Sequence, residues 1–111
     1  MEICYRSRKL EKLCNIEKEM RAKLGPRLVG VLQQRLAELR AADNLEDMRS
    51  LPGAGCHELS QDRKGQIAVT LVHPRRLVFE PADEPLPSKQ DGGLDWGRVT
   101  RIRIIEIVDY H

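Results

Sequence analysis

Hydrophobic residues follow two different periods along this chain. Up to about residue 40, the longest apolar stripe steps by four positions and once by three, through Met20, Leu24, Leu28, Leu32, Leu36 and Leu39. This spacing puts the stripe on one helix face and predicts a helical layer of about 25 residues that packs one face on another element. After residue 55 apolar and polar residues alternate, which is typical of strands.

The helical region is expected to contain more than one helix. Ser7 can accept a hydrogen bond from a free backbone N–H of a first turn, so it predicts a short helix that buries Leu10, Leu13 and Cys14. A second helical pattern begins near residue 15. Pro26 interrupts it, because proline lacks the backbone donor that a continuous helix needs. We expect either a kink there or a new helix with Pro26 at its first position.

Five segments have the alternation or composition of strands. They are residues 2–6, 56–60, 66–73, 76–80 and 98–108. Short turn-forming stretches separate the three central segments, which predicts an antiparallel meander. Helices come first and strands second, so the expected fold class is α+β, with the N-terminal helices packed on one face of a small antiparallel sheet.

The last predicted strand has an irregular pattern. Ile102 and Ile104 lie on one face of a regular strand, whereas Ile105 and Ile107 lie on the other. The strand is therefore either covered on both sides or bulged near Ile104 and Ile105. It follows a segment rich in Pro, Gly and acids, residues 81–97, which is too long for a hairpin turn and predicts a functional lid or a mobile insert.

Length and composition place the chain among globular proteins. The 111 residues suit one domain, 1–111, and 41% of them are hydrophobic while 32% are charged. Since no apolar run approaches the roughly 20 residues of a membrane-spanning helix, we expect a soluble protein without a membrane partner. The three cysteines have no paired spacing, which fits a reducing compartment and predicts a cytoplasmic location.

The formal net charge of +2 is unevenly distributed. Residues 1–40 carry ten Lys or Arg and five acids, a balance of +5, so residues 41–111 carry −3. A basic segment of this kind indicates a polyanionic partner. Solvated helix faces with ordinary surface charge account for the same numbers, and charge alone favours this second interpretation.

Four short motifs occur in an order that resembles a known family. They are His57-x-Leu59, Asp62-x-Lys64-Gly65, Arg76-Leu77-Val78-Phe79 and the closing Val108-Asp109-Tyr110-His111. Together with the paired N-terminal helices, these motifs resemble the RelE/HigB-like toxins of bacterial type II toxin–antitoxin systems, and the HigB branch in particular. The resemblance covers most of the chain. That family usually has a tight turn before the last strand, so the segment 81–97 is a departure from its pattern.

The resemblance implies a small ribonuclease, built from helices on a sheet, that cuts messenger RNA in the ribosomal A site without a metal or other cofactor. It implies a role in plasmid maintenance and neutralisation by a cognate helix-turn-helix antitoxin, with a homodimer or a toxin–antitoxin heterotetramer as the assembly. The same scaffold carries a non-nuclease branch, the ParE-like proteins that inhibit gyrase. The alternative expectation is therefore a catalytically silent RelE/ParE-fold protein that binds an antitoxin, gyrase or another regulator.

Metal-free RNA cleavage needs a base for the 2′-OH, a cation for the charge that builds on the phosphate, and an acid for the leaving 5′-oxygen. His57 and His111 suit the base and acid tasks, because imidazole titrates near neutrality. Arg76 offers a planar, permanently charged fork to the phosphate. Asp109 can act as a base or set a histidine tautomer, and Tyr110 can stack on a nucleobase or donate a hydrogen bond.

Three further cations are candidate RNA contacts, because the phosphate backbone attracts Lys and Arg. They are Arg63, Lys64 and Arg75. A zinc site is not expected, since the cysteines and histidines show no recognised ligand spacing. Cys56 stands beside His57, but adjacent strand residues face opposite ways, so Cys56 is expected to be a small core residue rather than a nucleophile. Without the resemblance, His57 and the arginines would be interpreted as ordinary strand and turn residues.

Overall fold

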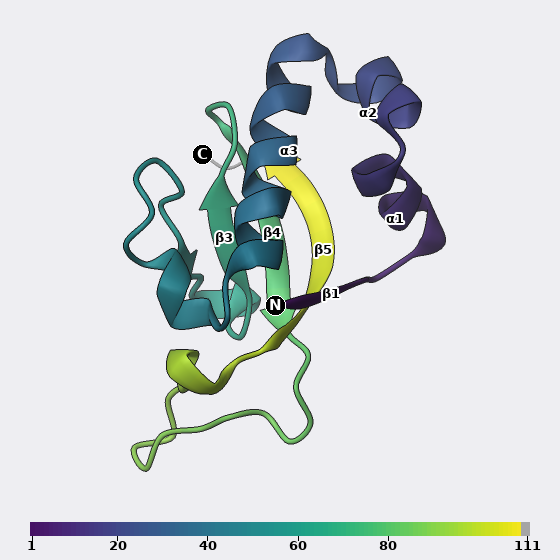
Figure 1. Cartoon of the computed structure of the whole chain (residues 1–111). Helices are drawn as coiled ribbons and strands as arrows, with labels where there is room; N and C mark the ends of the chain where they lie inside the picture. The colour runs from purple at the N-terminus through teal and green to yellow at the C-terminus, as the bar shows by residue number, and fades with distance from the viewer. Residues whose placement is uncertain (110–111) are drawn as a thin grey trace.

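Five strands form one mixed sheet in the computed structural model, which describes residues 1–109 (Figure 1). In spatial order they are β1 (Glu2–Tyr5), β5 (Arg101–Asp109), β4 (Arg75–Pro81), β3 (Ile67–Thr70) and β2 (His57–Glu58). The predicted α+β fold is confirmed. The sheet is mixed rather than purely antiparallel, because β1 runs parallel to β5 while every other neighbouring pair is antiparallel. Only a long crossover can join parallel strands, and the helices lie in it.

Three helices follow β1: α1 (Arg8–Asn15), α2 (Glu17–Leu24) and α3 (Pro26–Ala41). Ser7 caps α1 as predicted, since its Oγ accepts a hydrogen bond from Leu10 N at 3.1 Å. Of the two alternatives at Pro26, a new helix is correct, and Pro26 lies in the first turn of α3, where the missing N–H has no cost. No helix within residues 1–109 has the length and apolar character needed to cross a membrane.

The main core lies between the helices and one face of the sheet. It contains Leu28, Leu32, Leu36 and Leu39 of α3 and Ile67, Val69, Leu77, Phe79, Ile102 and Ile104 of the strands, all of them buried. Burying a side chain of this size stabilises the fold by roughly 1.5–3 kcal/mol. The core therefore fixes which face of each strand is turned toward α3, and the opposite face is called the far face below.

A β-bulge in β5 explains the irregular pattern of isoleucines. Val78 pairs with Glu106, while the next residue of β4, Phe79, pairs with Ile104, so Ile105 is an extra residue. Ile104 packs in the main core, whereas Ile105 packs in a smaller cluster on the far face. The bulge, one of the two alternatives that the sequence left open, is confirmed.

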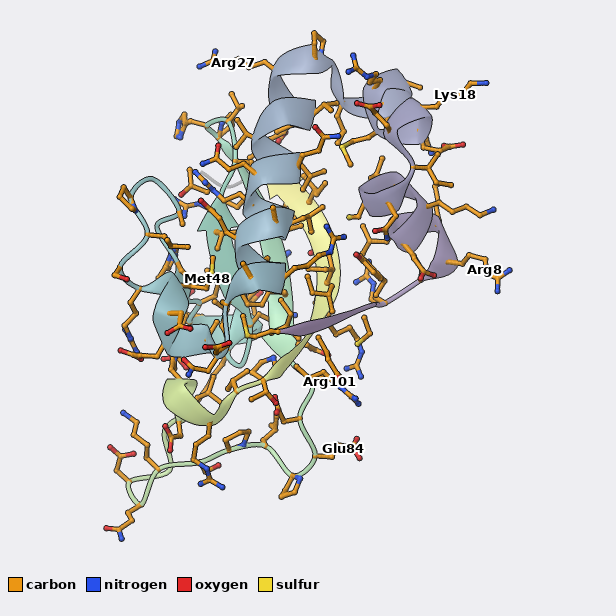
Figure 2. The ribbon with its side chains drawn as sticks, in the orientation of Figure 1. Arg8, Lys18, Arg27, Met48, Glu84 and Arg101 are labelled. Atoms are coloured by element: carbon orange, nitrogen blue, oxygen red, sulfur yellow. The ribbon has the colours of Figure 1, made fainter. Side chains whose placement is uncertain are left out.

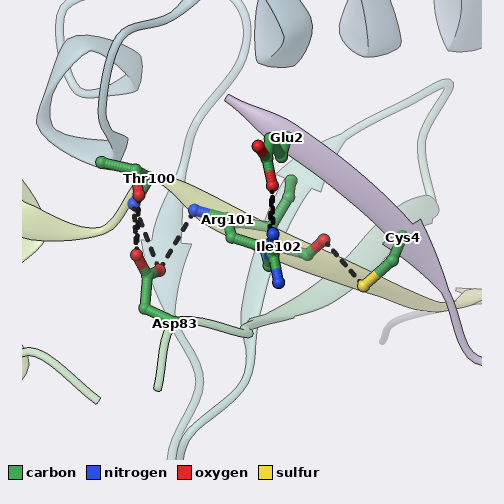
Figure 3. Close-up of polar contacts among 6 residues, drawn as sticks. All are labelled: Glu2, Cys4, Asp83, Thr100, Arg101 and Ile102. Atoms are coloured by element: carbon green, nitrogen blue, oxygen red, sulfur yellow. Dashed lines mark hydrogen bonds and ion pairs between the residues drawn. The ribbon is translucent and has the colours of Figure 1, made fainter. Parts of the chain in front are cut away.

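The segment between β4 and β5 extends beyond one end of the sheet (Figure 1). Figure 3 shows how it is attached: the Asp83 carboxylate accepts hydrogen bonds from Thr100 N (3.1 Å), Thr100 Oγ1 (2.7 Å) and Arg101 N (3.1 Å). Burial of Asp83 opposes ionisation, but these hydrogen bonds together outweigh it and lower the pKa of the carboxyl group. The first residues of β5 are thereby clamped to the segment.

Candidate functional site on the far face of the sheet

The far face carries two of the predicted catalytic residues, His57 and Arg76. Strand pairing aligns Thr70, Arg76 and Val108 in one row beside the β3–β4 turn, and His57, Ala68, Val78 and Glu106 in the next row. Ala68 and Val78 belong to the far-face apolar cluster. Because alternate strand residues share a face, His57 and Arg76 project on the same side of the sheet as this cluster.

His57 and Arg76 lie two strands and two residues apart. With about 4.8 Å between strands and about 3.3 Å per residue, their Cα atoms are about 12 Å apart. His57 is exposed and Arg76 is half-buried. The imidazole and the long guanidinium side chain therefore project from the same face of the sheet across this distance.

A hydrogen bond to its own loop orients the ring of His57. Nδ1 lies 2.8 Å from the carbonyl oxygen of Gly55, which can only accept a hydrogen bond, so Nδ1 carries a proton. In the neutral ring the acceptor is then Nε2. This is the tautomer that a general base requires if Nε2 takes the proton from a substrate hydroxyl.

The loop before His57 is held by α3 and β3. Arg35, only 7% exposed, donates from Nη2 to Gly53 O at 2.7 Å and from Nε to Thr70 O at 2.8 Å. Gly55 has a φ of +55°, and a Cβ there would lie 2.8 Å from Thr70 Oγ1. Both the left-handed backbone and the close approach of β3 require glycine. These contacts fix the carbonyl group that orients His57.

Two ion pairs involve other cations of this region. Arg63 Nη2 contacts Glu106 Oε1 at 2.6 Å, and Arg103 Nη1 contacts Glu80 Oε2 at 2.7 Å. Each guanidinium therefore has a carboxylate that competes with an RNA phosphate for its donors. Lys64, another predicted RNA contact, is exposed and follows the 3₁₀ turn Gln61–Arg63.

Asp109 and Arg75 lie on the helix side of the sheet. Arg75 and Asp109 are paired across β4 and β5, two residues from the pair Leu77 and Ile107, which pack toward the main core. Residues two apart in a strand share a face, so Arg75 and Asp109 are on the core side as well. Arg75 Nε lies 3.3 Å from Asp109 Oδ1; Asp109 is exposed and Arg75 is half-buried. The predicted RNA contact Arg75 is thus on the opposite face from Arg76.

Of the predicted cluster at the chain end, the structure describes only Asp109; Tyr110 and His111 lie outside the described residues. Three strand spacings and three residues separate His57 from Asp109, which puts their Cα atoms about 17 Å apart. At that distance, and on opposite faces, the two side chains cannot share one phosphate. The described residues bring together His57 and Arg76 but not Asp109.

The acids of the segment 81–97 are remote from Arg76. β4 begins with Arg75 at the β3–β4 turn and ends with Pro81, where the segment starts. The five residue steps from Arg76 to Pro81 span about 17 Å. The carboxylates of the segment therefore lie toward the other end of the sheet and do not oppose an anion at Arg76.

A thiol nucleophile beside His57 is not supported. Burial raises the pKa of the Cys56 thiol to about 12, although the charge of Arg49 acts in the opposite direction. The thiol is therefore protonated at neutral pH and unreactive. Within residues 1–109, no group of three or more His, Cys, Asp or Glu side chains is placed to hold a metal ion.

Sequence patterns did not single out Arg35, Gly55 or Glu106. Arg35 and Glu106 nevertheless interrupt apolar patterns, because Arg35 stands beside Leu36 in a buried helix face and Glu106 stands among isoleucines. A charge at such a position needs a partner when the chain folds. This interruption is the signal by which both residues could have been found.

Comparison with known proteins gives no family: the chain matches no protein-family model and no curated protein. The site is therefore defined by its geometry. It consists of an imidazole with a fixed tautomer, a guanidinium on the same face, and a loop that α3 holds in place.

Proposed function

We propose that this chain is the toxin of a toxin–antitoxin module, a metal-free endoribonuclease that cuts messenger RNA in the ribosomal A site. The observation that supports this most strongly is the hydrogen bond from His57 Nδ1 to Gly55 O, which leaves Nε2 as the acceptor on the face that Arg76 shares. The fold also agrees with the resemblance to RelE/HigB-like toxins. A cytoplasmic location and a helix-turn-helix antitoxin belong to the same proposal.

In the proposed reaction His57 is the general base. Its Nε2 takes the proton of the 2′-OH, the 2′-oxygen attacks the phosphorus, and the bond to the 5′-oxygen breaks to leave a 2′,3′-cyclic phosphate. Arg76 stabilises the charge that builds on the phosphate oxygens. The leaving 5′-oxygen takes a proton from an acid, for which His111 and Tyr110 are the candidates. Asp109 takes no part in the proposed reaction, because its side chain is on the helix side of the sheet, opposite to His57 and Arg76.

A catalytically silent binding protein of the same fold is the second candidate. The far-face ion pairs Arg63–Glu106 and Arg103–Glu80 favour it, because they occupy cations that would otherwise contact RNA. Such a protein would act by binding an antitoxin, gyrase or another regulator. His57 would then be a surface residue of its strand, with no role in proton transfer.

Expression of the chain in bacteria without an antitoxin separates the two candidates. The ribonuclease proposal predicts growth arrest that is relieved by His57→Gln, which cannot accept a proton at neutral pH, and by Arg76→Met. His73→Gln is the matched control, because His73 is exposed at the β3–β4 turn, away from the proposed base. It should arrest growth like the parent chain.

Growth arrest that persists in His57→Gln would support the silent binding protein, and so would the absence of arrest. Equal amounts of folded protein are verified for each variant. The chain is expressed without an N-terminal tag, because the Met1 ammonium group donates hydrogen bonds to Leu39 O (3.1 Å) and Arg40 O (3.0 Å) at the end of α3. A tag at that end would remove these contacts.

A further inference from the structure

Half of strand β5 has an unpaired edge. β1 pairs with β5 only from Arg101 to Ile104, and the last backbone hydrogen bond on that side runs from Arg6 N to Ile104 O at 2.9 Å. β5 continues to Asp109. Over its remaining length, no backbone hydrogen bond on the β1 side joins it to another of residues 1–109. An edge of this kind is a template for a further strand.

The alternation of hydrogen bonds shows which groups are available. The Arg75 carbonyl oxygen accepts a hydrogen bond from Leu71 N at 3.1 Å, so the backbone N–H and C=O groups of Arg75 point toward β3. Backbone groups of successive strand residues point to opposite edges, so those of Arg76, the next residue of β4, point toward β5. The partner of Arg76 in β5 is Val108. The residues on either side of Val108, Ile107 and Asp109, therefore direct their backbone N–H and C=O groups away from β4, to the unpaired side.

A groove of about 640 Å³ runs along this edge. One wall is the second half of β5, and the other is formed by α1 and α2, which Figure 1 shows beside that half of the strand. Leu10, Leu13 and Leu24 line the helical wall, and each is half-buried. The groove thus combines an unpaired strand edge with apolar side chains, as sites that bind an extended peptide do.

The groove has an excess of positive charge. Arg6, Lys9 and Lys23 line it and are exposed, and none of them has an ion pair within the described part of the chain. Its two acids are already paired, Glu106 with Arg63 (2.6 Å) and Asp109 with Arg75 (3.3 Å). Three cations are therefore available to an occupant, and this charge decides its chemistry.

We propose that this groove binds an extended acidic segment of a partner polypeptide, which adds to the sheet as a strand beside β5. Backbone groups of Ile107 and Asp109 pair with the segment, its acidic side chains meet Arg6, Lys9 and Lys23, and its apolar side chains contact the leucines of the helical wall. A second copy of this chain does not suit the groove, because symmetric pairing of two β5 edges would bring the same cations together. The inference does not depend on the proposed nuclease activity, since neither His57 nor Arg76 lines the groove.

The test uses the full chain and a capped eight-residue peptide of alternating Glu and Val. Binding is followed by titration and by hydrogen exchange at the amides of Ile107 and Asp109. Two control peptides are used: one has Lys in place of Glu, and one keeps the Glu residues but is N-methylated at alternate backbone nitrogens. We expect the acidic peptide to slow exchange at both amides by about tenfold or more at saturation, since it closes an open edge, while both controls bind at least about tenfold more weakly.

Charge-reversal variants give a matched comparison. Reversal of the groove cations in Arg6→Glu/Lys9→Glu/Lys23→Glu should weaken binding of the acidic peptide by at least about tenfold. The control reverses Arg8, Lys18 and Arg27, which point outward from the helices (Figure 2), and should leave the affinity unchanged.

Three outcomes would overturn the proposal. The first is equal binding of the N-methylated and unmodified acidic peptides, which would exclude strand pairing. The second is the absence of binding by the acidic peptide at millimolar concentration. The third concerns the protein alone, without peptide: hydrogen-exchange protection of the Ile107 and Asp109 amides that increases with protein concentration would assign the edge to a second copy of the chain.

Discussion

Substitution of Arg35 by Met tests whether α3 holds the loop that orients His57. The Arg35 side chain is 8% exposed and joins three groups: Glu38 at 3.0 Å, Gly53 O at 2.7 Å and Thr70 O at 2.8 Å. A hydrogen bond to a charged group contributes about 1.5–3 kcal/mol, and loss of one partner of a buried ion pair costs about 3–5 kcal/mol. Because Met fills much of the vacated volume, we expect the free energy of unfolding to fall by about 3–4 kcal/mol.

Urea unfolding followed by circular dichroism measures this loss, and thermal unfolding should show a decrease in Tm of at least about 10 °C. Arg35→Lys keeps the charge but lacks the planar fork that reaches two carbonyl groups, so it should recover less than half of the loss. The control is Arg21→Met, whose ion pair with Glu17 is mostly exposed, with side chains 62% and 58% accessible. It should leave the unfolding midpoint unchanged. If Arg35→Met destabilised the protein no more than Arg21→Met, the assignment of Arg35 as the link between α3 and the loop would be refuted.

Two further substitutions test other parts of the structure. Gly55→Ala should cost about 1–3 kcal/mol of unfolding free energy, because alanine is strained at a φ of +55° and its Cβ would approach Thr70 Oγ1 to 2.8 Å. Gly30→Ala lies in an exposed turn of α3, where nothing beyond the neighbouring helix backbone lies within 4 Å of the added Cβ, so it should stabilise the protein by about 0.5–1 kcal/mol. Equal effects of the two alanines would contradict the explanation given for Gly55. Asp83→Asn should destabilise at pH 7 by about 1–2 kcal/mol. Since the folded-state pKa of Asp83 lies below its ordinary value of 3.8, the contribution of the carboxylate is present above that pH and is lost as the pH falls through the folded-state pKa. The difference between parent and variant should therefore narrow in acid, and a constant difference from pH 7 to pH 2 would show that the charge of Asp83 does not stabilise the clamp.

The helical half of the fold could be predicted in detail because its signals are local. The spacing of leucines fixed the buried face of α3, and Ser7 and Pro26 marked where two helices begin. The short 3₁₀ turn Leu45–Met48 is local in the same way, because Asn44 Oδ1 accepts a hydrogen bond from Asp47 N at 3.3 Å. Each of these features depends on side chains within one or two turns of the chain.

The pairing of β1 could not be predicted in the same way. Glu2–Tyr5 pairs with Arg101–Ile104, almost the full length of the chain away, and no local pattern specifies a partner at that separation. β2 is also shorter than its alternation predicts, with only His57 and Glu58 in the sheet. Tertiary contacts decided both features, as is usual for strands.

The candidate site depended on the same kind of non-local information. The sequence proposed His57 and Arg76 as catalytic candidates, and the register puts them on one face. The sequence did not predict that Asp109 is on the helix side of the sheet, because one extra residue in the bulge at Ile105 changes the face of every later residue of β5. The hydrogen bond from His57 to Gly55 O was also hidden, since it requires a left-handed residue that only the folded loop reveals.

Cleavage of messenger RNA on purified ribosomes tests the central claim most directly. The purified chain is added to ribosomes stalled with a defined codon in the A site, and the cut is mapped by primer extension under single-turnover conditions. We expect a cut within the A-site codon, a rate reduced by about 10²-fold or more in His57→Gln, and no change in His73→Gln. Cleavage by His57→Gln at the rate of the parent chain, or no cleavage by the folded parent chain, would contradict the assignment of His57 as the base of a ribosome-dependent ribonuclease.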